Sequence, residues 1–115
     1  MVRMRVVILS SHSLFAEGIA SRLRQHLQSV EFEIMDPRQP DAMAQIAATQ
    51  PSIVILDGTD SGATQSCFLS KLLLTFPKLK VICLDPQQEQ IQVVTSEQHR
   101  AVKVHDLVEV INRFA

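Results

Sequence analysis

The chain has 115 residues, enough for one domain with a hydrophobic core and too few for two ordinary domains. Its 11 Lys and Arg residues nearly balance its 12 Asp and Glu residues, and the formal net charge of −1 argues against a nucleic-acid-binding protein. The chain has only 3 Gly and no Trp or Tyr, which argues against a glycine-rich nucleotide-binding loop and against a surface of aromatic side chains that stack on a ligand. We therefore expect residues 1–115 to form a single domain.

The cysteines and the hydropathy of the chain indicate its cellular compartment. Cys67 and Cys83 show neither metal-ligand spacing nor a disulfide framework, and their apolar neighbours favour small buried side chains. The longest apolar runs are about four residues, far short of a membrane span. The N-terminus lacks the length and cleavage site of a secretory signal. These features predict a cytoplasmic protein that does not enter the membrane.

The first third of the chain alternates strand and helix patterns. Val6–Leu9 is a continuous apolar run, which is typical of a strand buried on both faces. Apolar residues at every fourth position from 15 to 27 predict an amphipathic helix of about four turns. Apolar and acidic residues alternate over Val30–Ile34, which predicts a strand with one wet face near a sheet edge.

The middle third repeats this alternation. Asp41 is positioned to cap a short helix through Ala48, and we expect its inward side chains to be Met43, Ile46 and Ala47. The apolar runs 52–56 and 80–84 predict two more buried strands, which end at Asp57 and Asp85, with a helix over 68–76 between them.

The last third has weaker signals. Residues 87–95 hold four glutamines and no clean period, so helix and extended chain both stay open. Ala101–Val104 is the candidate last strand. A final amphipathic helix is expected to begin near His105 or Asp106, with an apolar stripe of Leu107, Val108, Ile111 and Phe114.

Apolar strands that alternate with amphipathic helices predict an α/β fold, a doubly wound five-stranded parallel sheet with helices on both faces. In such folds ligands bind at the carboxyl ends of the strands, near the point where the strand order reverses. The candidate site residues are therefore those that follow the predicted strands: Ser10, Ser11, Asp57, Asp85 and Lys103.

Three segments carry a resemblance to a known family. Residues 8–19, ILSSHSLFAEGI, are similar to the I-x-D-D-H-x-L-F-R-E-G-L stretch of response-regulator receiver domains that precede helix-turn-helix output domains. Residues 51–57, PSIVILD, are similar to the family's P-D-[VI]-[VI]-[LI]-[LM]-D, and residues 79–84, LKVICL, stand in the place of its fourth strand. The chain thus resembles a receiver over nearly its whole length, which implies a flavodoxin-like sheet of order 2-1-3-4-5.

The resemblance assigns Asp57 to the phospho-accepting aspartate. In the family a divalent cation is held by that residue, by two acids after the first strand and by a backbone carbonyl just beyond the acceptor. The acid positions are Ser10 and Ser11 here, and hydroxyls are poor substitutes in a Mg²⁺ site. We expect no metal site, with Asp57, Thr59 and Asp60 as weak candidates.

Two further positions depart from the family pattern. Asp85 stands where a hydroxyl residue would bond the phosphoryl group, and its charge would repel a phosphate on Asp57. Lys103 matches the lysine of the family's fifth strand, but it lies 18 positions after Asp85, a few short of the family's spacing. The fourth helix region is therefore expected to be shortened or irregular, and the chain is identified as a degenerate, or pseudo-receiver, type.

Structural interpretations of the same residues stay open. Asp57, followed by Gly58, also fits a residue that starts a turn. The hydroxyls of Ser10, Ser11 and Ser13 are expected to cap the first helix. The glutamine-rich residues 87–98 predict a solvated surface or a face that binds a partner.

The preferred functional hypothesis is a non-enzymatic module of two-component phosphorelay signalling that works by protein contacts and needs no cofactor. Its partners would be other signalling proteins, a histidine kinase, an output domain or a second copy, with no direct contact to nucleic acid. The alternative is a working phospho-receiver that uses Asp57 and Mg²⁺, and a distant one is a flavodoxin-like cofactor binder. No output domain lies within the 115 residues, so either a stand-alone regulator or part of a longer one is expected. The candidate helix residues for contact with a partner are Phe68, Leu69 and Phe114.

Overall fold

The computed structural model describes residues 4–58, 66–85, 87, 89–96 and 103–114, with the backbone alone at 66–68 and 114. Five strands are present within these ranges: β1 (Met4–Leu9), β2 (Val30–Met35), β3 (Ile53–Asp57), β4 (Lys80–Asp85) and β5 (Gln90–Thr95). Four helices accompany them: α1 (Ser13–His26), α2 (Ala42–Thr49), α4 (Ser66–Thr75) and α5 (Val104–Phe114).

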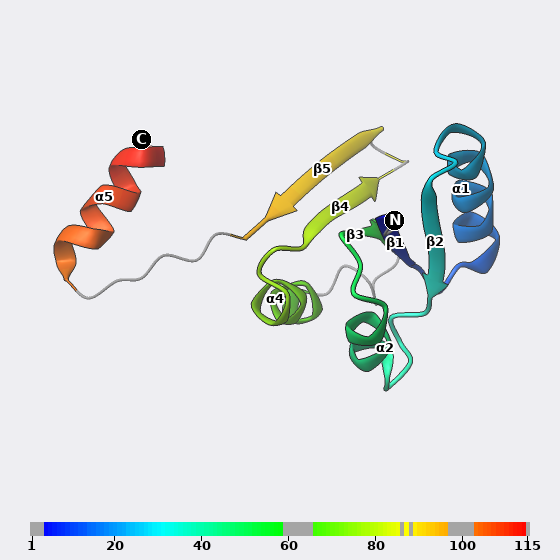
Figure 1. Ribbon diagram of the computed structural model, residues 1–115, viewed down its shortest axis with the longest axis horizontal. Coiled ribbons are helices and arrows are strands. Elements are labelled where there is room, and N and C mark those ends of the chain that lie inside the picture. Colours follow the sequence, from blue (N-terminus) through cyan, green and yellow to red (C-terminus); the bar gives the residue numbers. More distant parts are fainter. Residues whose placement is uncertain (1–3, 59–65, 86, 88, 97–102, 115) are drawn as a thin grey trace.

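The five strands form one sheet of order β2-β1-β3-β4-β5, which confirms the expected order (Figure 1). The strands from β1 to β4 pair in parallel, whereas β5 is antiparallel to β4, so the prediction of an all-parallel sheet is wrong at this edge. The cause is the short connection. Only residues 86–89 separate the two strands, and a parallel crossover needs a dozen residues or more. That length also leaves no room for a helix between them.

The sequence patterns also predict the wrong position for the last strand. It lies at Gln90–Thr95, within the stretch whose structure stayed open, and not at Ala101–Val104. Residues 101 and 102 lie outside the described residues, but Val104 is the first residue of α5. Ile91 and Val93 alternate with glutamines in β5, and this short alternation is the signal that could have located the strand.

Helices lie on both faces of the sheet, as expected (Figure 1). Val6 and Ile8 of β1 point to one face, where they pack with α1. Val7 and Leu9 point to the other face and pack with Ile46 of α2 and with α4. The continuous apolar run at β1 is thus explained by burial on both sides of its strand.

The residues that bring two helices against the sheet differ from those predicted. In α1 the fully buried residues are Ala16 and Ala20. Phe15, Ile19 and Leu23 of the predicted stripe lie half-buried beside them, and Leu27, just past the helix, is exposed. In α2 the prediction that Ala47 faces inward is wrong, because Ala47 is exposed and Ala42 is buried. Small side chains allow close approach of a helix to the sheet. A hydropathy pattern selects larger apolar residues before alanine, so it did not identify these alanines as the buried positions.

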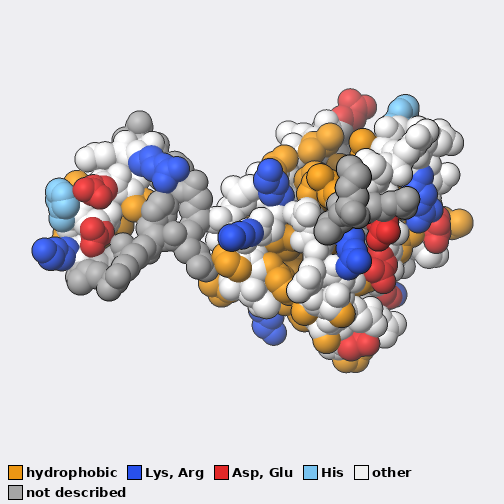
Figure 2. Space-filling view, in the orientation of Figure 1, with side chains coloured by type: hydrophobic (Ala, Val, Ile, Leu, Met, Phe, Trp, Pro, Cys, Tyr) orange, Lys and Arg blue, Asp and Glu red, His pale blue; other side chains and the backbone are white. Residues whose placement is uncertain are grey.

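The carboxyl-terminal helix α5 lies apart from the sheet (Figure 1). Acidic and basic side chains are interspersed on the face shown in Figure 2, as the near-neutral charge suggests. In the part of the chain that the structure describes, no helix has the length and apolar character needed to cross a membrane.

Candidate functional site

Ser10 and Asp57 meet at the carboxyl edge of the two central strands. In the β1–β3 register Ile8 pairs with Ile55, so two residues further along each strand Ser10 and Asp57 point to the same face. The Ser10 hydroxyl donates a hydrogen bond to Asp57 Oδ2 over 2.8 Å. The strand order reverses between these neighbours, since β2 follows β1 on one side and β4 follows β3 on the other. The pair therefore occupies the position where doubly wound sheets bind ligands.

Both members of this pair are buried. Asp57 has 0% of its surface exposed and Ser10 has 3%. Ser10 also accepts a hydrogen bond from the backbone N–H of His12 over 3.0 Å, so one hydroxyl links the strand end, the turn and the carboxylate. A buried carboxylate is costly without hydrogen-bond donors, and Ser10 supplies one of the contacts that Asp57 makes.

Ser10 therefore does not cap the first helix. The residue before α1 is His12, and its own side chain makes no capping hydrogen bond. Ser11 is half-buried and Ser13 begins the helix, exposed. The expected capping role is wrong for Ser10, because its hydroxyl is oriented toward Asp57.

Gly58 brings β3 and β4 close together just beyond Asp57. Its N–H donates a hydrogen bond to the Leu84 carbonyl over 2.6 Å. A β-carbon at position 58 would lie 2.3 Å from that carbonyl oxygen and 3.0 Å from its carbon. Glycine is therefore required here for close approach of two backbones.

Asp85 lies at the same edge of the sheet but on a different face from Asp57. The register pairs Asp57 with Leu84, so strand alternation places Asp85 with Cys83 on the face that α4 covers. Asp85 Oδ1 accepts a hydrogen bond from the Gln87 N–H over 3.1 Å. Asp85 thus organises the turn into β5.

Lys103 lies at the beginning of α5 and outside the sheet, so the structure does not bring it to Asp57 (Figure 1). Its backbone N–H donates to Asp106 Oδ2 over 3.0 Å, and its side chain is exposed. The expectation of a fifth-strand lysine beside the acceptor fails because the last strand ends at Thr95.

The weak metal candidates Thr59 and Asp60 lie outside the described residues. Among the residues that are described, no group of three or more His, Cys, Asp or Glu side chains is arranged to hold a metal ion. The contact candidates Phe68 and Phe114 belong to helices whose side chains at these positions are outside the description, while Leu69 packs half-buried against the core.

A cavity of about 310 Å³ lies next to the strand ends, between α4 and the β4–β5 hairpin. Cys83 contributes to its wall, and burial raises the pKa of this thiol above its ordinary value. A raised pKa disfavours the reactive thiolate, which agrees with an unreactive packing residue. Other residues in the wall are Leu56, Gly58, Leu69, Asp85 and Gln92.

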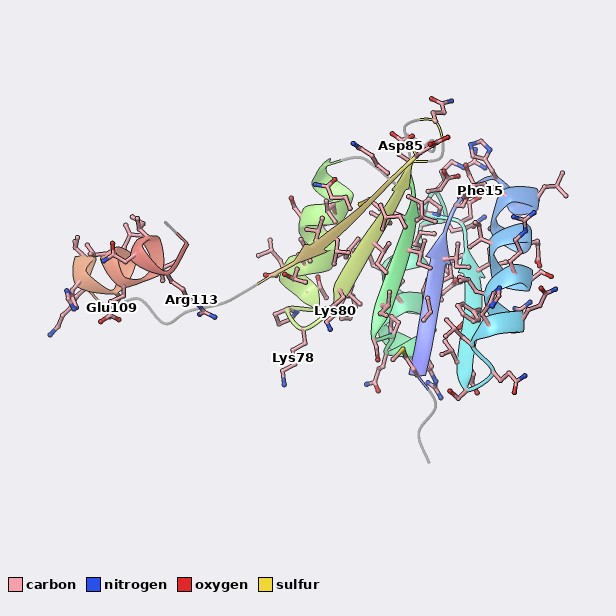
Figure 3. All side chains as sticks on the ribbon, turned by 90° about the horizontal axis from the view of Figure 1, so that it is seen from above. Phe15, Lys78, Lys80, Asp85, Glu109 and Arg113 are labelled. Carbon is pink, nitrogen blue, oxygen red and sulfur yellow. The ribbon has the colours of Figure 1, made fainter. Side chains whose placement is uncertain are left out.

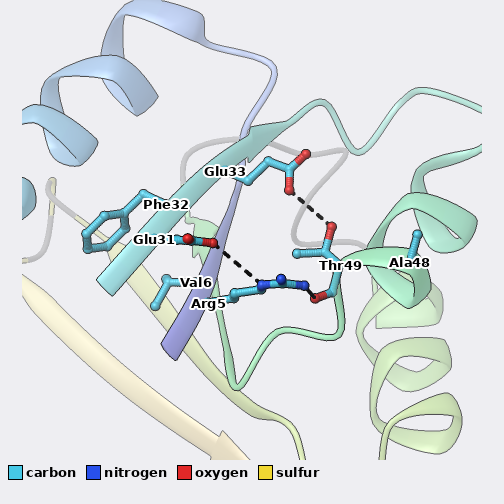
Figure 4. Close-up of a pocket in the computed structure, with 7 residues that line it drawn as sticks. All are labelled: Arg5, Val6, Glu31, Phe32, Glu33, Ala48 and Thr49. Atoms are coloured by element: carbon cyan, nitrogen blue, oxygen red, sulfur yellow. Dashed lines mark hydrogen bonds and ion pairs between the residues drawn. The ribbon is translucent and has the colours of Figure 1, made fainter. Parts of the chain in front are cut away.

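A second pocket, of about 350 Å³, was not foreseen from the sequence; it lies between β2 and the end of α2 (Figure 4). Arg5 in this pocket pairs with Glu31 at 3.6 Å and donates to the Thr49 carbonyl at 3.0 Å. The Thr49 hydroxyl donates to Glu33 over 3.1 Å. These polar groups contact one another, and the hydrogen bonds of Thr49 with Arg5 and Glu33 hold the end of α2 against the sheet.

Comparisons of the chain with protein-family models, with curated proteins and with solved structures found no match.

Proposed function

We propose that the chain is a receiver-like signalling module that acts through protein contacts, with its phosphotransfer chemistry lost. The proposal takes its family from the resemblance of residues 8–19 and 51–57 to receiver domains. The strand order and the position of Asp57 at the carboxyl edge of β3 support it.

The hydrogen bond from Ser10 to the buried Asp57 carries the proposal. A receiver uses a carboxylate at the position of Ser10 to hold a cation beside the acceptor. In this chain that position donates a hydrogen bond to the acceptor carboxylate and occupies one of its oxygens. The carboxylate is also fully buried, so neither a cation nor a phosphodonor reaches it without local opening.

The loss of two acids removes the electrostatic basis of phosphotransfer. Catalysis of phosphoryl transfer relies on a metal ion or cationic side chains to neutralise the developing charge. Hydroxyls replace the acids at positions 10 and 11, and Lys103 lies away from Asp57. The fold is then retained for recognition, in a chain that is not an enzyme and works in the cytoplasm on other signalling proteins.

The first experiment treats the purified chain with a small-molecule phosphodonor and Mg²⁺ and measures its intact mass. We expect no phosphate adduct on the wild-type chain. A mass increase of one phosphoryl group that disappears in Asp57→Asn would overturn the proposal in favour of the working phospho-receiver. A colourless preparation without bound nucleotide disposes of the flavodoxin-like cofactor binder.

A second experiment tests the receiver geometry itself by restoring the acids in the double variant Ser10→Asp, Ser11→Asp. Without metal, we expect the new carboxylates to lower Tm through repulsion of Asp57. Millimolar Mg²⁺ should then raise the Tm of this variant. If Mg²⁺ has no effect on it, the strand ends do not have receiver geometry. The matched control Ser10→Asn, Ser11→Asn adds similar volume without charge and should not respond to Mg²⁺.

A further inference from the structure

An apolar groove runs along the sheet between α1 and the edge strand β5. Its cavity of about 300 Å³ is walled by Phe15 and Ile19 of α1 and by Leu84 and Ile91 of the hairpin. The β4–β5 register pairs Ile82 with Val93 and Leu84 with Ile91, and paired residues share a face. Ile82 and Leu84 belong to the α1 side of the core, so the apolar side chains of β5 point to that side as well.

The β5 side of this groove is open. Ile91 is 71% exposed and Val93 is 60% exposed, although both stand on the apolar face of the sheet. Within the described ranges α1 is the helix whose side chains pack into this face, and its contacts centre on the β1–β2 half. Exposed apolar area that is continuous with a core marks a surface for binding another element.

Helix α5 carries the complementary surface. Its apolar stripe is formed by Val104, Leu107, Val108 and Ile111, which are 79%, 55%, 44% and 56% exposed. An isolated helix of 11 residues is only marginally stable in water, and most helices depend on packing of an apolar face. A stable α5 therefore requires a partner for this stripe.

The dimensions of the helix and the groove agree. An 11-residue helix is roughly 16 Å long, and the six residues of β5 span roughly 20 Å. A helix with its side chains is about 10 Å wide, which covers two neighbouring strands about 4.8 Å apart. The exposed β4–β5 strip therefore accommodates one helix beside α1.

Charges at the ends indicate the direction of such a helix. Glu89 lines the groove at the carboxyl edge of the sheet, near Phe15, which Figure 3 labels. Arg113 is in the last turn of α5 and Asp106 in its first turn. A helix antiparallel to α1 brings Arg113 toward Glu89, and it sets Asp106 beside the basic last turn of α1, so side chains of opposite charge face each other at both ends.

We propose that the groove binds α5 of a second copy of this chain, and that two copies exchange their helices reciprocally to form a homodimer. In the structure α5 lies beyond β5 and away from the groove of its own chain (Figures 1 and 3). Each copy thus offers both a groove and a helix, and a two-fold pair covers both surfaces at once. This dimer is independent of the chemistry proposed at Asp57.

Sedimentation and light scattering over a concentration series test the dimer. We expect a species of twice the 12.9 kDa chain mass that dissociates on dilution. Leu107→Ser on the helix and Ile91→Ser on the groove should each shift the dissociation at least tenfold toward monomer. The matched controls are Glu109→Ser on the polar side of α5 and Gln92→Ser on the opposite face of β5, and neither should change it. A monomer at all concentrations, or a dimer indifferent to Leu107→Ser and Ile91→Ser, overturns the proposal.

Cross-linking determines which copy supplies the helix. In a Cys67→Ala, Cys83→Ala background, one preparation carries Leu107→Cys and another carries Ile91→Cys. Mixing under oxidising conditions should give a disulfide-linked pair of both chains. If a chain with both new cysteines closes a disulfide only within itself, α5 packs on its own sheet and the exchange is refuted. Circular dichroism establishes that each variant is folded.

Discussion

The centre of the sheet and its β5 edge have similar apolar patterns, but their apolar side chains differ in burial. At the β1–β3 centre, Val7, Leu9 and Val54 are fully buried, because helices cover both faces. At the β5 edge, Ile91 and the stripe of α5 are mostly exposed. Periodicity thus identifies which face of an element is apolar, but the covering element follows from topology.

Core truncation should give the largest effect and the clearest contrast between a covered and an open position. Leu72 and Leu74 lie on the same helix, α4, but Leu72 is 0% exposed and Leu74 is 74% exposed. We expect Leu72→Ala to lower the free energy of unfolding by about 2–5 kcal/mol through lost burial and a cavity. The same change at Leu74 should stay within about 0.5 kcal/mol in urea denaturation.

Equal losses at the two leucines would contradict this difference in burial. A large loss at Leu74 alone would mean that its side of α4 is covered in solution. The two variants share helix propensity and substitution chemistry, so the burial of the side chain is what distinguishes them.

The covered part of the fold was predictable because its signals are local and strong. Two patterns located these elements within a few residues: the continuous apolar runs at β1 and β3, and the apolar residue at every fourth position of α1. The direction of β5 was not predictable from propensity, since it depends on the four residues between Asp85 and Gln90. Loop length was visible only once the correct strand was recognised.

The candidate site was predictable in position but not in contacts. Sequence reasoning located Ser10 and Asp57 at neighbouring strand ends, but the hydrogen bond between them depends on the β1–β3 register. Asp85 illustrates the limit, because a shift of one residue along a strand changes the face on which a side chain lies. Lys103 was expected in the last strand but lies at the start of α5, because the last strand ends earlier in the chain, at Thr95.

Removal of the Ser10 hydroxyl should give the next largest effect. Ser10→Ala deletes a donor to a buried carboxylate, and hydrogen bonds to charged groups are worth about 1.5–3 kcal/mol. We expect a loss of that size in the free energy of unfolding. Ser21→Ala, at an exposed position of α1, is the matched control and should change stability by less than about 0.5 kcal/mol. Equal effects of the two variants would show that the bond to Asp57 contributes nothing.

A pair of glycines provides a third test at the same edge. Gly58→Ala places a β-carbon against the Leu84 carbonyl and should cost about 1–3 kcal/mol through overpacking. Gly18→Ala in α1 meets no atom within 4 Å, and the better helix propensity of alanine should stabilise by about 0.5–1 kcal/mol. Opposite signs in thermal unfolding are expected. A neutral Gly58→Ala would mean that β3 and β4 separate easily at the candidate site.

The smallest expected effect is the response of the wild-type chain to Mg²⁺. A site saturated one hundredfold above its Kd would stabilise the fold by about 2.7 kcal/mol. For a domain of this size, each kcal/mol raises Tm by roughly 4–8 °C. Because Asp57 is buried beside a serine that donates to it, we expect 10 mM Mg²⁺ to change Tm by less than about 1 °C relative to an equal ionic strength of NaCl. A rise of several degrees that is lost in Asp57→Asn would instead mean that the covered centre of the sheet opens to a cation, and that Asp57 belongs with the accessible part of the molecule.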